Sequence, residues 1–176
     1  MMQISIFIRS TTMKYHFLFF LLFTCILQTK GQQQIDLHVN QSRLSRNIQE
    51  LAKYGKNEAG GSDRVAYSSH DIAARTFIIQ QLKDLGLDVS VDFAGNIIGK
   101  KSGSNPELRP IAFGSHIDEV PNGGNYDGPV GSMGAIEVIQ TLIESKTITR
   151  HPLEIIIFTN EEGGAVAYQH LTLHTI

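Results

Sequence analysis

Residues 111–158 decide the fold, and they read IAFGSHIDEVPNGGNYDGPVGSMGAIEVIQTLIESKTITRHPLEIIIF. The apolar residues 111–113 predict a buried strand. Hydrophobic residues at helical spacing over 132–145 predict a helix, and the apolar run 153–158 predicts a central strand. A strand, a helix and a second strand in this order indicate a parallel crossover, in a sheet with helices on both faces.

Upstream of this unit the sequence predicts two helices and two strands. Hydrophobic residues at helical spacing over 44–51 predict a short helix. Ser68 is a candidate N-cap for a second helix, which Gly86 should end. Alternating residues over 87–91 and a short run over 97–100 predict strands. We therefore expect an α/β fold with a mixed, mainly parallel sheet flanked by helices.

Length and composition narrow the class of protein. The chain has 176 residues, which at about 100–200 residues per domain favours one domain. With 41% hydrophobic and 18% charged residues, it can form a packed core. The net charge is 15 − 17 = −2, which gives no basic surface for nucleic acid. The single cysteine, Cys25, excludes an intrachain disulfide and a cysteine-based zinc module.

The N-terminus resembles an export signal. Lys14 precedes an apolar run over 17–27, FLFFLLFTCIL, which is shorter than the about 20 residues that span a bilayer but fits the core of a signal peptide. We expect residues 1–31 to be a signal peptide cleaved after Gly31, so that 32–176 is exported to the periplasm or the medium with no membrane contact. An uncleaved anchor is the alternative.

Three groups of potential metal ligands stand near the predicted strand ends. His116 and Asp118 follow the strand that begins at 111, and Asp127 lies in a glycine-rich loop. Glu161 and Glu162 follow the last strand. Ligands of parallel sheets bind beyond the carboxyl ends of the strands, so we expect these side chains to converge. Imidazole and carboxylates without thiolates suit zinc or manganese.

The spacing of these residues indicates separate roles. On an extended chain, His116 and Asp118 point to the same side, so Asp118 is expected to accept the second ring N–H of His116. Asp127, flanked by glycines, can approach an ion closely and bridge two ions through its two oxygens. Glu161 and Glu162 would repel each other as unpaired carboxylates, so we expect one to bind metal and the other to act as general base.

Each motif also has a structural explanation. An H-x-D pattern arises by chance, an Asp-Gly pair is ordinarily a turn, and two glutamates after a strand are typical of a helix start. Only their joint position at strand ends favours a metal site.

Two longer motifs resemble a known family. GSHIDEVPNGGNYDGPVG over 114–131 and EIIIFTNEEGG over 154–164 resemble the hydantoinase/carbamoylase group of amidohydrolases. This group includes N-carbamoyl-L-amino acid hydrolase, bacterial-type beta-ureidopropionase and allantoate amidohydrolase. It belongs to a clan of dizinc aminoacylases, dipeptidases and carboxypeptidases. The resemblance covers about residues 43–164 and implies a dizinc exopeptidase-like catalytic core.

The resemblance implies a role for each site residue. His116 and Glu162 would each ligate one of two divalent ions, zinc or manganese, and Asp127 would bridge them. Glu161 would be the catalytic base or acid, and Asp118 the partner of His116. The peptide bond after Asp127 would be cis, as is usual in relatives. The implied reaction is hydrolysis of a non-peptide C–N bond, in a small ureido or amide substrate such as an N-carbamoyl-L-amino acid or allantoate, by water that two metal ions activate.

Departures from the family pattern leave other readings open. Glu119 stands where relatives commonly have threonine, which adds a third carboxyl to the site. Residues 165–176 do not follow the family's continuation, although His170 and His174 have the helical spacing of a metal pair. We expect 32–176 to be the N-terminal part of a catalytic domain, without the dimerisation domain through which full-length relatives form homodimers. An exported metallopeptidase of the same clan and a catalytically silent fragment are the alternatives.

Overall fold

The computed structural model of the protein describes residues 37–164. The predicted signal peptide over 1–31, with Cys25, lies outside these residues, as do His170 and His174, so those expectations stay predictions. No helix within 37–164 has both the length and the apolarity that crossing a bilayer requires.

Four strands form one mixed sheet in the order β1-β2-β4-β3. The strands are β1 (Asp88–Val91), β2 (Ile97–Lys101), β3 (Ile111–His116) and β4 (Leu153–Phe158). Only β3 and β4 pair in parallel, whereas β1 with β2 and β2 with β4 pair antiparallel. The prediction of a mainly parallel sheet is therefore wrong for the described residues.

Connection lengths explain the mixed sheet. Asp92 accepts hydrogen bonds from the backbone N–H groups of Ala94 and Asn96, which closes a tight turn between β1 and β2. A turn this short can join only antiparallel neighbours. The chain between β3 and β4 is long enough for a helix, and it returns β4 parallel to β3, as predicted.

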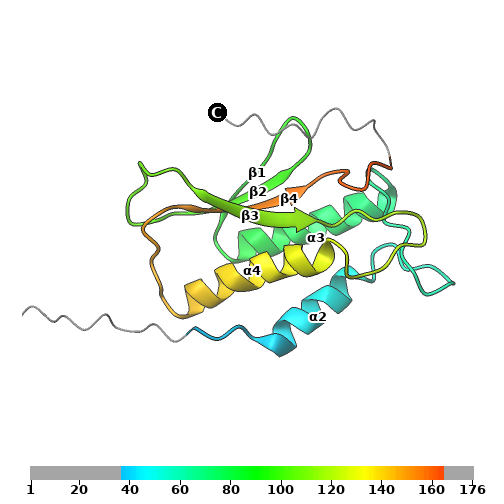
Figure 1. Ribbon diagram of the computed structural model, residues 1–176, viewed down its shortest axis with the longest axis horizontal. Helices are drawn as coiled ribbons and strands as arrows, with labels where there is room; N and C mark the ends of the chain where they lie inside the picture. Colours follow the sequence, from blue (N-terminus) through cyan, green and yellow to red (C-terminus); the bar gives the residue numbers. More distant parts are fainter. Residues whose placement is uncertain (1–36, 165–176) are drawn as a thin grey trace, which may run out of the picture. The chain divides into compact units, whose positions relative to one another are not determined.

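The three described helices lie on one side of the sheet. They are α2 (Gln41–Leu51), α3 (Ser69–Asp84) and α4 (Pro129–Glu144). Figure 1 shows α3 and α4 packed against the same face of the sheet, with α2 against α4 on the side away from the strands. The expected cover of both faces is thus not found among these elements.

The hydrophobic core fills the space between this sheet face and the helices. Strand residues Ile97, Ile155 and Ile157 are fully buried there. They pack with buried residues of the helices, namely Leu51, Ala74, Ile78, Leu82, Met133, Ile136 and Ile139. Burying each large aliphatic side chain contributes about 1.5–3 kcal/mol, so this layer is the main source of stability for the frame that carries the strand ends.

The ends of α3 match the sequence signals, but α4 begins earlier than predicted. The side chain of Ser68 accepts the N–H of Asp71 at 3.2 Å, and Gly86 after the helix has a φ of +75°. Helix α4 begins at Pro129, three residues before the predicted start, with Gly128 as N-cap at a φ of +76°. Proline suits the first helical position because its missing N–H would be unpaired there. The early start brings the helix close to the end of β3.

Candidate metal centre

His116, the last residue of β3, presents one ring nitrogen to the site. The residue is only 6% exposed, and its Nδ1 lies 3.0 Å from the backbone carbonyl oxygen of Asp118. A carbonyl oxygen only accepts hydrogen bonds, so this contact favours the tautomer with the proton on Nδ1. The Ser132 hydroxyl donates to the His116 carbonyl at 2.7 Å and fixes the backbone. The lone pair of Nε2 is therefore available to a metal ion.

Two glutamates approach this nitrogen from the end of β4. Within residues 37–164, one group of potential ligands stands out: a ring nitrogen of His116 and carboxylate oxygens of Glu161 and Glu162 all lie within 4.8 Å of one another. The His116 Nε2 to Glu161 Oε2 distance is 3.4 Å. Around a tetrahedral ion with bonds of about 2.1 Å, ligand atoms are about 3.4 Å apart. These residues therefore fit a divalent cation.

The chain after β4 is held by contacts from distant segments. Thr159 donates its N–H to the side chain of Asn96 at 3.0 Å, and its hydroxyl accepts from Arg75 at 2.7 Å. Asn160 then adopts a left-handed conformation with a φ of +58°. This turn directs the chain away from the strand, so that the two glutamates face the end of β3.

Asp118 links the two strand ends, but not through the contact that was predicted. Its carboxylate accepts the backbone N–H groups of Glu161 at 3.4 Å and Glu162 at 3.2 Å. The same carboxylate is 4.0 Å from Nδ1 of His116, beyond hydrogen-bond range, and the ring nitrogen faces the Asp118 carbonyl instead. The buried carboxylate thus orients the backbone of the glutamate pair. A catalytic role for Asp118 stays a prediction.

Asp127 lies at the open side of the site. Its Oδ1 is 4.0 Å from Nε2 of His116, its side chain is 88% exposed, and it is not part of the group of three ligands. Its role as a bridge between two ions stays a prediction. The expected cis peptide after Asp127 is wrong, since every peptide bond within residues 37–164 is trans.

Gly128 is a site residue that our sequence analysis missed. A Cβ atom on Gly128 would lie 2.5 Å from Cε1 of the His116 ring. Only glycine leaves room for the imidazole there, and only glycine adopts the local φ of +76° without strain. The signal was present in the Asp-Gly-Pro sequence, because proline at a first helical position places the preceding residue at the cap.

Glu119 is not part of the group of three potential ligands. Its carboxylate forms a buried ion pair with the guanidinium of Arg64. Burial raises the pKa of Glu119, and burial lowers the pKa of Arg64. The expected crowding of a third carboxyl into the ligand group is therefore relieved by a residue 55 positions earlier in the chain.

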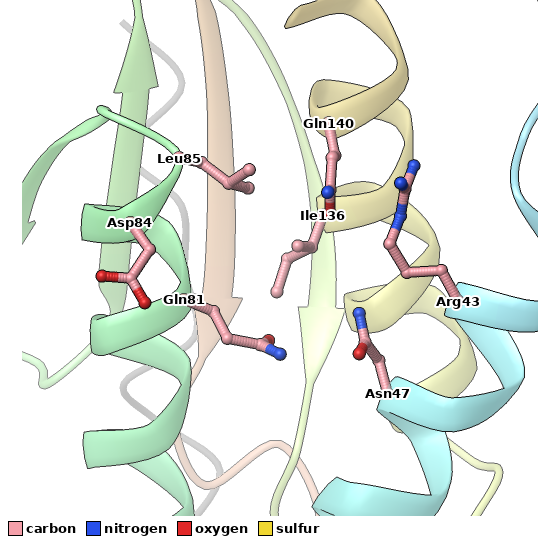
Figure 2. A pocket seen from close by; sticks show the side chains of 7 residues that line it. All are labelled: Arg43, Asn47, Gln81, Asp84, Leu85, Ile136 and Gln140. Atoms are coloured by element: carbon pink, nitrogen blue, oxygen red, sulfur yellow. The ribbon is translucent and has the colours of Figure 1, made fainter. Parts of the chain in front are cut away.

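A separate hollow of about 330 Å³ lies between the helices (Figure 2). Seven residues line it: Arg43, Asn47, Gln81, Asp84, Leu85, Ile136 and Gln140. None of the predicted site residues is among them. Arg43 is already paired with Glu137 and Glu144, so its charge is not offered to a ligand in the hollow.

Known proteins match this chain in sequence and in fold. The family model described as Peptidase family M28 matches residues 96–174. An N-carbamoyl-L-amino acid amidohydrolase of Geobacillus stearothermophilus is 40% identical over 122 residues, which are 69% of this chain and 30% of that protein. A ureidoglycolate hydrolase of Oryza sativa subsp. japonica is 41% identical over 125 residues, 71% of this chain and 26% of that protein.

A solved structure gives the same result. A hydantoinase/carbamoylase family amidase from Burkholderia ambifaria superposes with a TM-score of 0.72 at 37% identity, over 73% of this chain and 32% of that one. This chain spans about 30% of the length of the relatives it matches. Over that span, the chain belongs to the hydantoinase/carbamoylase group of amidohydrolases.

Proposed function

We propose that this protein is a metal-dependent hydrolase of non-peptide C–N bonds, acting on ureido or amide compounds such as N-carbamoyl-L-amino acids or allantoate. The observation that carries the proposal is the convergence of a ring nitrogen of His116 with the carboxylates of Glu161 and Glu162 within 4.8 Å. The names of similar proteins support the substrate class, since they include N-carbamoyl-L-amino acid amidohydrolase, ureidoglycolate hydrolase and allantoate amidohydrolase.

His116, Asp127 and Glu162 would hold two divalent ions, zinc or manganese. Nε2 of His116 would supply the nitrogen ligand, and the exposed carboxylate of Asp127 would offer its two oxygens for a bridge. Such ions polarise a bound carbonyl and make water acidic near neutral pH. The Asp118 carbonyl beside Nδ1 favours the Nδ1–H tautomer of the neutral ring, in which the lone pair of Nε2 faces the ligand group.

Glu161 would move the proton. Its carboxylate lies 3.4 Å from Nε2 of His116 and is half exposed, so it faces the same space as the ligands while staying open to substrate. In the hydrolysis, the oxygen of water attacks the ureido carbonyl carbon while Glu161 takes the proton of that water. Glu161 then gives the proton to the leaving nitrogen as the C–N bond breaks. A carbamate product decomposes to ammonia and carbon dioxide.

Two variants distinguish the proposed metal ligand, Glu162, from the proposed base, Glu161. We expect Glu162→Gln to lower the affinity for zinc, measured by calorimetric titration. Glu161→Gln should keep the metal and lose about 10²–10⁴-fold in rate, measured as ammonia release from N-carbamoyl-L-amino acids. Metal binding by the wild-type chain without turnover of any ureido substrate would contradict the hydrolase and favour a catalytically silent chain.

A peptidase of the same clan is the second candidate, because the matching family model is described as a peptidase family. A panel of dipeptides in the same assay distinguishes the two activities. We also propose export through residues 1–31, on the strength of the apolar run after Lys14. N-terminal sequencing of protein recovered outside the cytoplasm should begin at Gln32.

A further inference from the structure

Arg64 is a fully buried cation whose hydrogen bonds reach two separate parts of the chain, residues 51–54 and residues 117–119. Its Nη1 donates to the carbonyl oxygens of Leu51 at 3.0 Å and Tyr54 at 2.7 Å, at the end of α2. Its Nε donates to the carbonyl oxygen of Ile117 at 2.5 Å, and its Nη2 donates to the Glu119 carboxylate. The Arg64 carbonyl in turn accepts the N–H of Glu119 at 2.9 Å.

The segment that Arg64 holds, residues 117–119, is also the segment that orders the candidate metal centre. The carbonyl of Asp118 faces Nδ1 of His116, and the carboxylate of Asp118 accepts the N–H groups of the two glutamates. Arg64 fixes this segment from both ends, through Ile117 and Glu119. A rotation of the peptide units between Ile117 and Glu119 would move Asp118. It would then change both the contact of the Asp118 carbonyl with His116 and the contacts of the Asp118 carboxylate with the glutamates.

The planar guanidinium is suited to this task. Arginine offers five N–H donors in a rigid fork, whereas lysine offers a single mobile ammonium. A buried ion pair adds little stability compared with apolar packing, so the directional donors are the property that this position uses. Burial lowers the pKa of Arg64, and the neighbouring Glu119 charge partly opposes that change.

We propose that Arg64 is a positioning residue, which fixes residues 117–119 so that His116 keeps its Nδ1–H tautomer and the two glutamates stay beside its ring. The inference rests on the proposed function, because the side chains it orders are those of the metal centre. The described hydrogen bonds of the Arg64 side chain go to Leu51, Tyr54, Ile117 and Glu119 and not to a proposed metal ligand.

The test compares Arg64→Lys with Arg43→Lys in the full chain. Arg43 is the matched control, since it also pairs with a buried glutamate, Glu137, but at the contact of α2 with α4. The first readout is the ¹⁵N NMR spectrum of the His116 ring without metal. We expect Arg64→Lys to shift the ring toward the Nε2–H tautomer and Arg43→Lys to leave it unchanged.

The second readout is zinc affinity by calorimetry. Arg64→Lys should lower it by about tenfold or more, and Arg43→Lys should change it by less than about twofold. A folded Arg64→Lys protein with the wild-type tautomer would overturn the inference. Wild-type protein that binds no zinc would contradict the proposed function. The metal-free NMR spectra would still show whether Arg64 controls the tautomer of His116. If Arg64→Lys does not fold, Glu119→Gln takes its place with the same expected shift, and an unchanged ring there would overturn the inference.

Discussion

The carboxylate of Asp118 accepts the backbone N–H of Glu162 at 3.2 Å, which joins the residue pair after β4 to the segment after β3. The contact is shielded from water because Asp118 is buried. Since His116 lies two residues before Asp118, one buried carboxylate fixes the distance between the imidazole and the glutamates.

Replacing Asp118 by asparagine should therefore weaken the metal centre without unfolding the protein. An asparagine side chain has one acceptor oxygen and an NH₂ group, so one of the two backbone N–H groups would face a donor. We expect zinc affinity to fall by about 10–100-fold, measured by calorimetry. Glu137→Gln is the control, because Glu137 is an equally buried carboxylate that accepts the N–H of Asn40 at 2.7 Å. Wild-type affinity in Asp118→Asn would show that the link is dispensable.

Two glycines with nearly the same φ help to separate backbone strain from displacement of the imidazole. Gly128 has a φ of +76° and Gly86 a φ of +75°. A Cβ would meet the His116 ring at 2.5 Å on Gly128 and nothing within 4 Å on Gly86. Alanine at either position should destabilise the protein by roughly 1 kcal/mol or more, measured by thermal unfolding.

Only Gly128→Ala should also affect zinc binding, because its methyl group must push the imidazole aside. We expect a large loss of zinc affinity in Gly128→Ala and wild-type affinity in Gly86→Ala. Equal zinc affinities in the two variants would mean that the His116 ring can move away from the new methyl group without losing the metal.

Sequence periodicity and turn residues predicted the helices and strands, because these signals act within a few residues. The N-cap at Ser68 and the stop at Gly86 are of this kind. The pairing of strands is not local, and the mainly parallel sheet was a wrong prediction for that reason. Ile72 of α3 is apolar but 59% exposed, since the orientation of α3 is set by packing against β1 and β2.

The convergence of His116 with the glutamates was predictable, because residues after neighbouring parallel strands share one edge. The orientation of Asp118 was not. The prediction took the chain to stay extended through Asp118, but β3 ends at His116, so the alternation of side chains no longer applies there. The partner of Glu119 could not be predicted either, because Arg64 lies far away in the sequence.

Two histidines provide a direct test of the metal ligand. Nδ1 of His116 lies 3.0 Å from the Asp118 carbonyl, and Nδ1 of His151 lies 2.8 Å from the Arg109 carbonyl. The two rings thus share the same kind of backbone contact, but only His116 is near the glutamates. We expect His116→Gln to abolish tight zinc binding and His151→Gln to preserve it. Zinc binding that survives His116→Gln would exclude the imidazole as a ligand.

The buried pair of Arg43 and Glu137 should make stability depend on pH in the acid range. Burial alone would raise the pKa of Glu137, but hydrogen bonds from Arg43 and the N–H of Asn40 outweigh it and lower the pKa below its ordinary 4.5. The folded protein therefore binds fewer protons at Glu137 than the unfolded chain does. The resulting stabilisation is present above pH 4.5 and is lost as the pH falls through the folded-state pKa.

Asp71 should act in the opposite direction. Burial raises its pKa above the ordinary 3.8, so its folded form binds more protons and gains relative stability as the pH falls. At neutral pH, Glu137→Gln should lose roughly 2 kcal/mol, because it removes the charge from the buried acceptor of Arg43, which keeps Glu144 as its other partner. Between about pH 6 and pH 3, its melting temperature should fall less steeply than that of the wild type, whereas that of Asp71→Asn should fall more steeply. If the melting temperatures of the three proteins changed with pH by the same amount, neither carboxyl would change its pKa on folding.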